Sequence, residues 1–405
     1  MLVNIEMDIK KFNGQRLRDA LQFRAKTMSD LSRETGISRQ SLSFYANNDN
    51  IPPFENVQKI SEGLSFPIDY FMTEDMCTTI TNNTYFRSQA TAKKKEQNAQ
   101  KIKLEYTAKM YEILLQYVDF PELKLPYSFD FNSNIHDPQN MGADSIMSEI
   151  EELASYVRKS WKIDDGPIEN MQYLLESNGI IVTGFKNVDN KIDAFSQKVN
   201  IKGKGSVYIV ALVVGEKPQC RLNFDMAHEL GHILMHNWDD SNDELDRDSF
   251  INLERQANMF ASALLLPQQA FSKDVSAYAT DVEFYRLLKK KWHVSMQAMM
   301  YRARQLNIIT ENQFQYMMRT ISAKGWRTHE PFDTPGILNI NIFQSAIDLL
   351  FEGGYLTARD LIKEFYINGV CLEQEDMEDL MGLKPGTLNT CEKNIQFIPK
   401  IKINK

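Results

Sequence analysis

The residues whose types and spacing best suit metal binding are two histidines four positions apart, His228 and His232, in the sequence HELGH. On an α-helix this spacing is about one turn, so both imidazoles project from one face and can reach one metal ion. Glu229 follows the first histidine and is displaced by about 100° around the helix axis. That displacement favours a role as a base toward water and not as a metal ligand. The alternative interpretation is a pair of core or surface histidines in an inactive enzyme.

A catalytic zinc ion needs a third protein ligand and an open fourth position. His236 is again four residues on, but in a straight helix it lies about 12 Å along the axis from His228. We therefore expect His236 to pack or to support a ligand from behind. A second predicted helix, LERQANMFASALLLP, places Glu254 and Asn258 on one face, with small alanines that allow a close helix crossing. Glu254 is the preferred third ligand and Asn258 a supporting residue. The competing carboxylates lie in the intervening loop: Asp243, Glu244, Asp246 and Asp248.

Together, FDMAHELGHILMH and ERQANMFASALLLP resemble the ImmA/IrrE family of metallopeptidases, and the similarity runs from about residue 149 to residue 326. The resemblance implies zinc (Zn²⁺) as cofactor, His228 and His232 as its ligands and Glu229 as the catalytic glutamate. It also implies that Glu254 is the acidic ligand of the ExxAN segment. Gln256 stands where relatives often carry a second acid, which leaves Glu254 as the only carboxylate of that motif.

A helix-turn-helix domain is predicted at the N-terminus. Gly36 fits the end of a second short helix, Ser38 fits the cap of a third, and Pro52-Pro53 ends that third helix. Short helix, Gly-containing turn and short helix are typical of a domain whose third helix enters the major groove. The segment resembles the XRE family of Cro-like regulators. The polar residues predicted to contact DNA are Ser38, Arg39, Gln40, Ser43 and Asn47.

The charge of this N-terminal segment gives only a weak electrostatic signal for nucleic acid. Residues 1–76 hold nine Lys/Arg against eleven Asp/Glu, whereas phosphate binding favours a basic surface. A four-helix protein-interaction domain that has lost DNA binding is therefore the alternative to a DNA reader.

The remaining segments predict connecting and accessory structure. Residues 78–84 read as a polar loop, and a helix with a basic run (Lys93 to Lys109) follows, either along phosphates or as a solvated face. IIVTGF, DAFS and SVYIVALVV predict strands, Arg221 to Phe224 an extended segment, and residues 280–309 a basic helix-turn-helix-like unit. That unit could contact nucleic acid, dock an acidic partner, or pack on the peptidase.

At 405 residues the chain is too long for one ordinary core. We expect a multidomain, mainly α fold with an α+β zincin-like metallopeptidase core, an all-α N-terminal domain and a helical C-terminal domain. The expected regions are a helix-turn-helix domain (1–76), a helical connector with a basic run (77–143), a zinc metallopeptidase domain (144–273), a helix-turn-helix-like unit (274–330) and an accessory helical domain (331–405).

Composition narrows the class of protein. The sequence is 43% hydrophobic and 25% charged, which is ordinary for a globular protein, and its net charge of −8 argues against a whole-chain nucleic-acid coat. No apolar run approaches the ~20 residues of a membrane span, and MLVNIEMDIKKF lacks the features of a secretion signal. Four scattered cysteines indicate free thiols in a reducing cytoplasm.

These features predict a cytoplasmic, DNA-binding transcriptional regulator that carries a site-specific zinc metalloendopeptidase. The family resemblance implies a narrow substrate, a helix-turn-helix repressor whose cleavage relieves repression in mobile elements or stress. Operator DNA, that repressor and a second copy of the chain are the expected partners, with no membrane. The peptidase would act on a partner at the promoter or on its own linker near residues 76–90. The rival hypothesis is a non-proteolytic transcription factor or antitoxin whose zinc domain is a structural or sensing module.

Overall fold

The computed structural model describes residues 12–74, 76–77, 80–86, 94–126, 143–185, 194–201, 203–215, 217–236, 238, 247–338 and 341–390. Within these ranges the chain is mainly helical and holds one four-stranded sheet. The predicted fold class, mainly α with an α+β core, is confirmed. No helix in this part of the chain has the length and apolar character needed to cross a membrane.

The N-terminal domain consists of α1 (Gly14–Phe23), α2 (Met28–Thr35), α3 (Arg39–Ala46), α4 (Phe54–Leu64) and the 3-10 helix η1 (Ile68–Met72). Gly36 ends α2 with a φ of 71°, a conformation that glycine adopts without strain. The Ser38 side chain accepts a hydrogen bond from the Ser41 backbone and so caps α3. The predicted helix-turn-helix geometry is confirmed.

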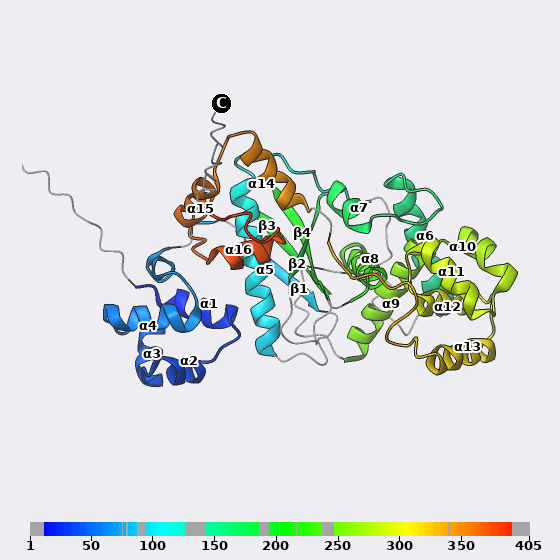
Figure 1. Ribbon diagram of the computed structural model, residues 1–405, viewed down its shortest axis with the longest axis horizontal. Helices are drawn as coiled ribbons and strands as arrows, with labels where there is room; N and C mark the ends of the chain where they lie inside the picture. The colour runs from blue at the N-terminus through cyan, green and yellow to red at the C-terminus, as the bar shows by residue number, and fades with distance from the viewer. Residues whose placement is uncertain are drawn as a thin grey trace, which may run out of the picture.

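The sheet lies in the middle of the molecule (Figure 1) and runs in the order β1-β3-β4-β2. Its strands are β1 (Ile80–Phe86), β2 (Ile180–Phe185), β3 (Ala194–Ile201) and β4 (Gly205–Val213). β3 pairs antiparallel with both β1 and β4, and β2 pairs parallel with β4. Because side chains alternate along a strand, the two faces of the sheet belong to two different hydrophobic cores.

One face of the sheet shares a core with α5 (Lys94–Leu114) and the C-terminal helices α14 (Ile342–Glu352), α15 (Ala358–Ile367) and α16 (Gln374–Met381). The N-terminal domain joins this core through the contact of α1 with α5. Arg16 of α1 is 3% exposed and donates to the Tyr106 hydroxyl of α5 at 2.9 Å and to the Gly369 carbonyl at 2.8 Å. Arg24, the C-cap residue of α1, pairs with Asp376 of α16. These contacts attach the helix-turn-helix domain both to α5, the next helix along the chain, and to the C-terminal helices.

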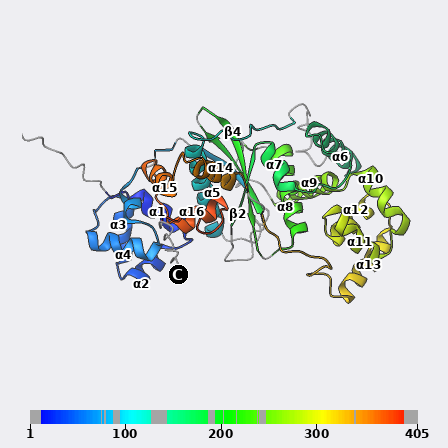
Figure 2. The same ribbon diagram turned by 45° about the horizontal axis from the view of Figure 1, so that its top comes forward.

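The other face packs with α6 (Ala143–Ser160), α7 (Met171–Ser177), α8 (Gln219–Met235) and α9 (Arg247–Leu265). Beyond them lie α10 (Gln268–Val275), η4 (Ser276–Tyr278), α11 (Val282–Trp292), α12 (Met296–Gln305) and α13 (Glu311–Ala323). Figure 2 shows these last helices at the end of the molecule opposite the helix-turn-helix domain.

Two local predictions outside the N-terminal domain were wrong. Arg221 to Phe224, expected to be extended, belong to α8, which starts directly after Pro218. Proline fits just before a helix because its missing N–H needs no partner there, and Leu222 and Met226 continue the buried face of the helix one turn earlier. Residues 80–84, expected in a loop, are part of strand β1.

In each of the two basic segments, some of the charged side chains are buried and form internal structure. Lys109 of α5 is buried beside Glu105, 2.6 Å away, which neither a phosphate contact nor a solvated face describes. Lys289 of α11 pairs at 2.9 Å with the buried Glu330. Arg302 of α12 is fully buried and donates to the Leu266 carbonyl at 3.0 Å. The packing interpretation of the 280–309 unit therefore holds for these two residues. Lys93 and the loop acids Asp243, Glu244 and Asp246 lie outside the described residues.

Candidate metal centre

Close contact between α8 and α9 creates the centre. A Cβ atom on Gly231 of HELGH would lie 3.1 Å from the Phe260 ring and 3.2 Å from the Ala257 Cα of α9. Any larger side chain would separate the two helices, so this glycine and Ala257 permit the crossing. The crossing places Glu254 of α9 beside the two histidines of α8.

The predicted ligand atoms converge on one point. Single ligand atoms from His228, His232 and Glu254 all lie within 4.8 Å of one another. The two Nε2 atoms are 3.0 Å apart, and they lie 3.4 Å and 3.2 Å from the two Glu254 oxygens. Both imidazoles are buried, while the Glu254 side chain keeps 16% of its exposure.

The orientation of His228 is fixed from behind by Asn258. Its Nδ1 lies 3.1 Å from the Asn258 Oδ1, and the amide nitrogen of Asn258 donates to the Glu254 carbonyl at 2.8 Å. Because Oδ1 can only accept, Nδ1 of His228 carries the proton. The Nε2 lone pair of His228 is therefore directed at the centre.

His232 is oriented by a longer relay. The Gln256 Oε1 lies 3.3 Å from Nε2 of His236, so that nitrogen carries the proton and the other, Nδ1, accepts. Nδ1 of His236 lies 2.7 Å from Nδ1 of His232, which therefore donates and leaves its Nε2 lone pair facing the centre. Burial, and secondarily the neighbouring His232, lower the pKa of His236 well below its ordinary value and keep it neutral.

The cluster fits a bound cation. Two imidazole lone pairs and a carboxylate face one another, and the Glu254 Oε1 is buried and accepts no hydrogen bond from the described residues. Two imidazoles and one carboxylate are a ligand set that zinc accepts in catalytic sites.

Glu229 does not join the three predicted ligands but forms a hydrogen bond with a residue of the sheet. It is fully buried, and its Oε2 accepts a hydrogen bond from the Ser196 hydroxyl of β3 at 2.5 Å. Ser196 lies on the sheet face toward α8, opposite Val210 of β4. Ser196 was not predicted from the sequence, because its face of β3 (Ala194, Ser196, Lys198 and Asn200) is mostly polar and no local pattern distinguishes the serine.

A cleft of about 890 Å³ borders the centre. Glu254 and Asn258 lie in its wall, together with residues of α8, α9 and α12. Most of the other lining side chains are apolar or basic, among them Phe224, Ile251, Tyr301, Arg221 and Arg255. The cleft therefore reaches Glu254, whereas His228 and His232 do not line it.

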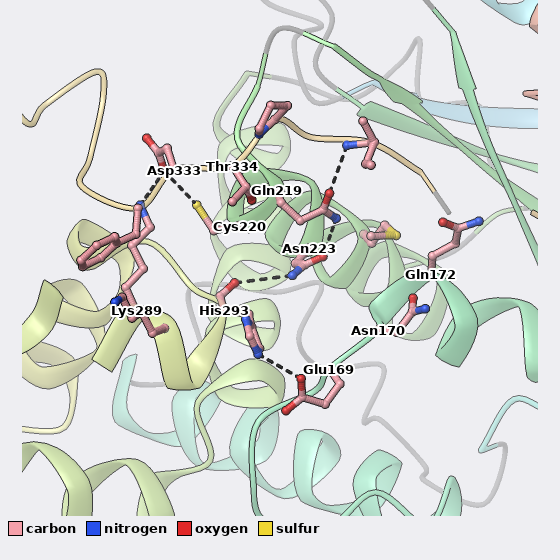
Figure 3. A pocket seen from close by; sticks show the side chains of 15 residues that line it. Glu169, Asn170, Gln172, Gln219, Cys220, Asn223, Lys289, His293, Asp333 and Thr334 are labelled. Atoms are coloured by element: carbon pink, nitrogen blue, oxygen red, sulfur yellow. Dashed lines mark hydrogen bonds and ion pairs between the residues drawn. The ribbon is translucent and has the colours of Figure 1, made fainter. Parts of the chain in front are cut away.

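A second cavity, of about 770 Å³, lies near the N-terminal end of α8 and does not include the cluster. Figure 3 shows its polar side chains bonded to one another: Gln219 donates to Asn223 at 3.2 Å, and His293 contacts Glu169 at 3.1 Å. His293 lines this cavity.

The five residues predicted to contact DNA lie together at α3 and are all exposed. The structure does not test whether they touch bases, so their role stays a prediction. The assignments of His228, Glu229, His232 and Glu254 are likewise carried forward as proposals about their chemistry.

Comparison with protein-family models places both functional regions. The IrrE N-terminal-like domain of peptidase family M78 matches residues 192–304, which include HELGH and Glu254, and a helix-turn-helix domain model matches residues 14–74. A search of the curated proteins found no match. The chain therefore joins a helix-turn-helix domain to an IrrE N-terminal-like domain of the M78 peptidase type, the fused architecture that its sequence predicts.

Proposed function

We propose that the protein is a DNA-binding regulator whose IrrE-like domain is a zinc-dependent, site-specific endopeptidase. Its proposed substrate is a helix-turn-helix repressor or its own chain, and cleavage would relieve repression in a mobile element or a stress response. The observation that carries the proposal is the buried cluster of His228, His232 and Glu254, with both Nε2 lone pairs directed at one point.

In this proposal His228, His232 and Glu254 hold the ion. A zinc ion there supplies Lewis acidity, which makes a water molecule a stronger acid and a peptide carbonyl a better electrophile. Glu229 accepts the proton of the attacking water and passes it to the leaving amine. Ser196 holds the Oε2 atom of Glu229 and so fixes the direction of the base.

The proposed DNA partner follows from the helix-turn-helix domain. Its third helix presents Arg39, Gln40 and Ser43 to solvent, with Ser38 and Asn47 at the two ends, and such side chains can bond base edges and phosphates. We further propose that two copies bind one operator, because domains of this kind meet two half-sites as dimers.

The test compares the wild-type protein with Glu229→Gln, which keeps every proposed ligand. Metal analysis should find about one zinc in both proteins. Sequencing of new protein N-termini in cells should find a cut helix-turn-helix protein, or a cut in this chain, only with the wild type. Equal patterns in the two strains would refute the peptidase proposal.

The rival proposal, a non-proteolytic regulator with a sensing module, has one specific observation in its favour. The second cavity is large enough for a small molecule, and its wall includes Cys220 and Lys289. If Glu229→Gln leaves regulation in cells unchanged while zinc removal abolishes it, this rival gains.

A further inference from the structure

The edge strand β1, which lies next to β3, comes from the linker between the two domains that the family models match. β1 follows the helix-turn-helix domain and pairs antiparallel with β3, with Tyr85 opposite Ser196 and Phe86 opposite Phe195. Ser196 is the residue whose hydroxyl contacts Glu229. The linker backbone therefore runs about 4.8 Å from the strand that orients the proposed catalytic base.

Both sides of β3 are already paired. In the order β1-β3-β4-β2, β4 occupies one side of β3 and β1 the other. An extended peptide binds a sheet by adding its main chain to a free edge. Since β4 is an inner strand of the domain itself, another peptide can pair with β3 only where β1 now lies.

β1 is the weaker of the two neighbours of β3. Its register with β3 shifts between Thr81 and Thr84, whereas β3 and β4 pair without interruption from Ala194 to Ile201. The shift falls at Asn82 and Asn83, a residue type depleted in strands. An irregular edge strand costs less to displace than an inner one.

We propose that β1 is an autoinhibitory strand, which occupies the edge of β3 that an extended substrate requires. This inference rests on the proposed peptidase function, and it assigns regulation of that site to the linker. The site accepts a strand from another protein only after β1 leaves β3.

The helix-turn-helix domain is placed to influence this release. Arg16 donates to the Thr73 carbonyl at 3.3 Å, and the Cys77 thiol lies 3.6 Å from the Asn368 carbonyl, so the chain leading to β1 is held against the C-terminal helices. If the helix-turn-helix domain shifts relative to the C-terminal helices, the start of the linker moves with it.

The test measures binding of a probe peptide in the Glu229→Gln background, where no turnover is expected. The probe is a fluorescein-labelled copy of residues 78–88, TTITNNTYFRS, and the assay is fluorescence anisotropy with and without zinc. Tyr85→Pro and, independently, Thr81→Pro remove a pairing residue of β1. Each should bind the probe at least tenfold more tightly than Glu229→Gln alone, whereas the matched control Thr78→Pro, outside β1, should not.

Hydrogen exchange of the same variants separates strand release from unfolding. Release of β1 should speed exchange at the β3 amides while β4 and α8 stay protected. If β1 is released and probe affinity does not change, or if Glu229→Gln alone binds the probe as tightly as the proline variants, the proposal is overturned. Absence of cleavage by the wild type would refute the peptidase and leave this binding result standing.

Discussion

Asn258 offers a sharp test of how the centre is built. Its Oδ1, 3.1 Å from Nδ1 of His228, is the group that assigns the proton to Nδ1 and the lone pair to Nε2. Asn258→Ala removes this acceptor and should fold, because alanine favours a helix at this position in α9. Asn258→Asp is the matched control, since it keeps an acceptor oxygen at the same place.

The expected size of the effect follows from the role of the hydrogen bond. Loss of a group that orients a liganding histidine typically lowers metal affinity 10- to 100-fold, which corresponds to about 1.4–2.8 kcal/mol. We therefore expect Asn258→Ala to bind zinc about 10- to 100-fold more weakly than the wild type and Asn258→Asp to bind within a few fold of it. Competition against a fluorescent chelator measures both.

Two outcomes would refute this reasoning. If Asn258→Ala binds zinc as tightly as the wild type, the proton assignment of His228 does not depend on Asn258. If both variants lose zinc equally while their helix content is unchanged, the side chain acts through its shape and not through its acceptor oxygen.

Further predictions test other parts of the chain. Burial raises the pKa of Glu176 to about 7, so the folded state holds this proton more tightly than the unfolded state does. The free energy of unfolding should therefore fall as the pH rises from about 4.5 to 7. Glu176→Gln should remove that fall and add about 1–3 kcal/mol to the free energy of unfolding at pH 8, measured by urea unfolding. Ser196→Ala should keep zinc but lower peptidase turnover by about tenfold or more, because Glu229 loses its hydrogen bond; unchanged turnover would exclude an orienting role. Arg16→Ala should cost about 2–4 kcal/mol by leaving buried partners unsatisfied and should expose the 73–80 region to limited proteolysis. Arg39→Ala should weaken binding to operators selected from a random DNA pool by about 1–3 kcal/mol, whereas Arg319→Ala, on the exposed side of α13, should not.

Local signals in the sequence determined the helix-turn-helix domain and the chemistry-bearing helix. Gly36 and Ser38 act within a few residues of themselves, so the end of α2 and the start of α3 could be predicted, and the structure confirms both. The prediction that Pro52-Pro53 ends the third helix was wrong, because α3 already ends at Ala46. The spacing of His228 and His232 fixes their common face for the same reason: a helix repeats every 3.6 residues whatever surrounds it.

Only the tertiary structure decided what meets these residues. Ser196 is 33 residues from Glu229 and reaches it because β3 lies against α8, a relation with no periodic trace in the sequence. The start of α8 and the strand character of residues 80–84 escaped prediction because a helix start after a lone proline and a polar edge strand are both decided by what packs beside them. The types of the proposed ligands could therefore be predicted from the sequence. Their orientation, the contact of Ser196 with Glu229 and the pairing of β1 with the sheet depend on long-range packing.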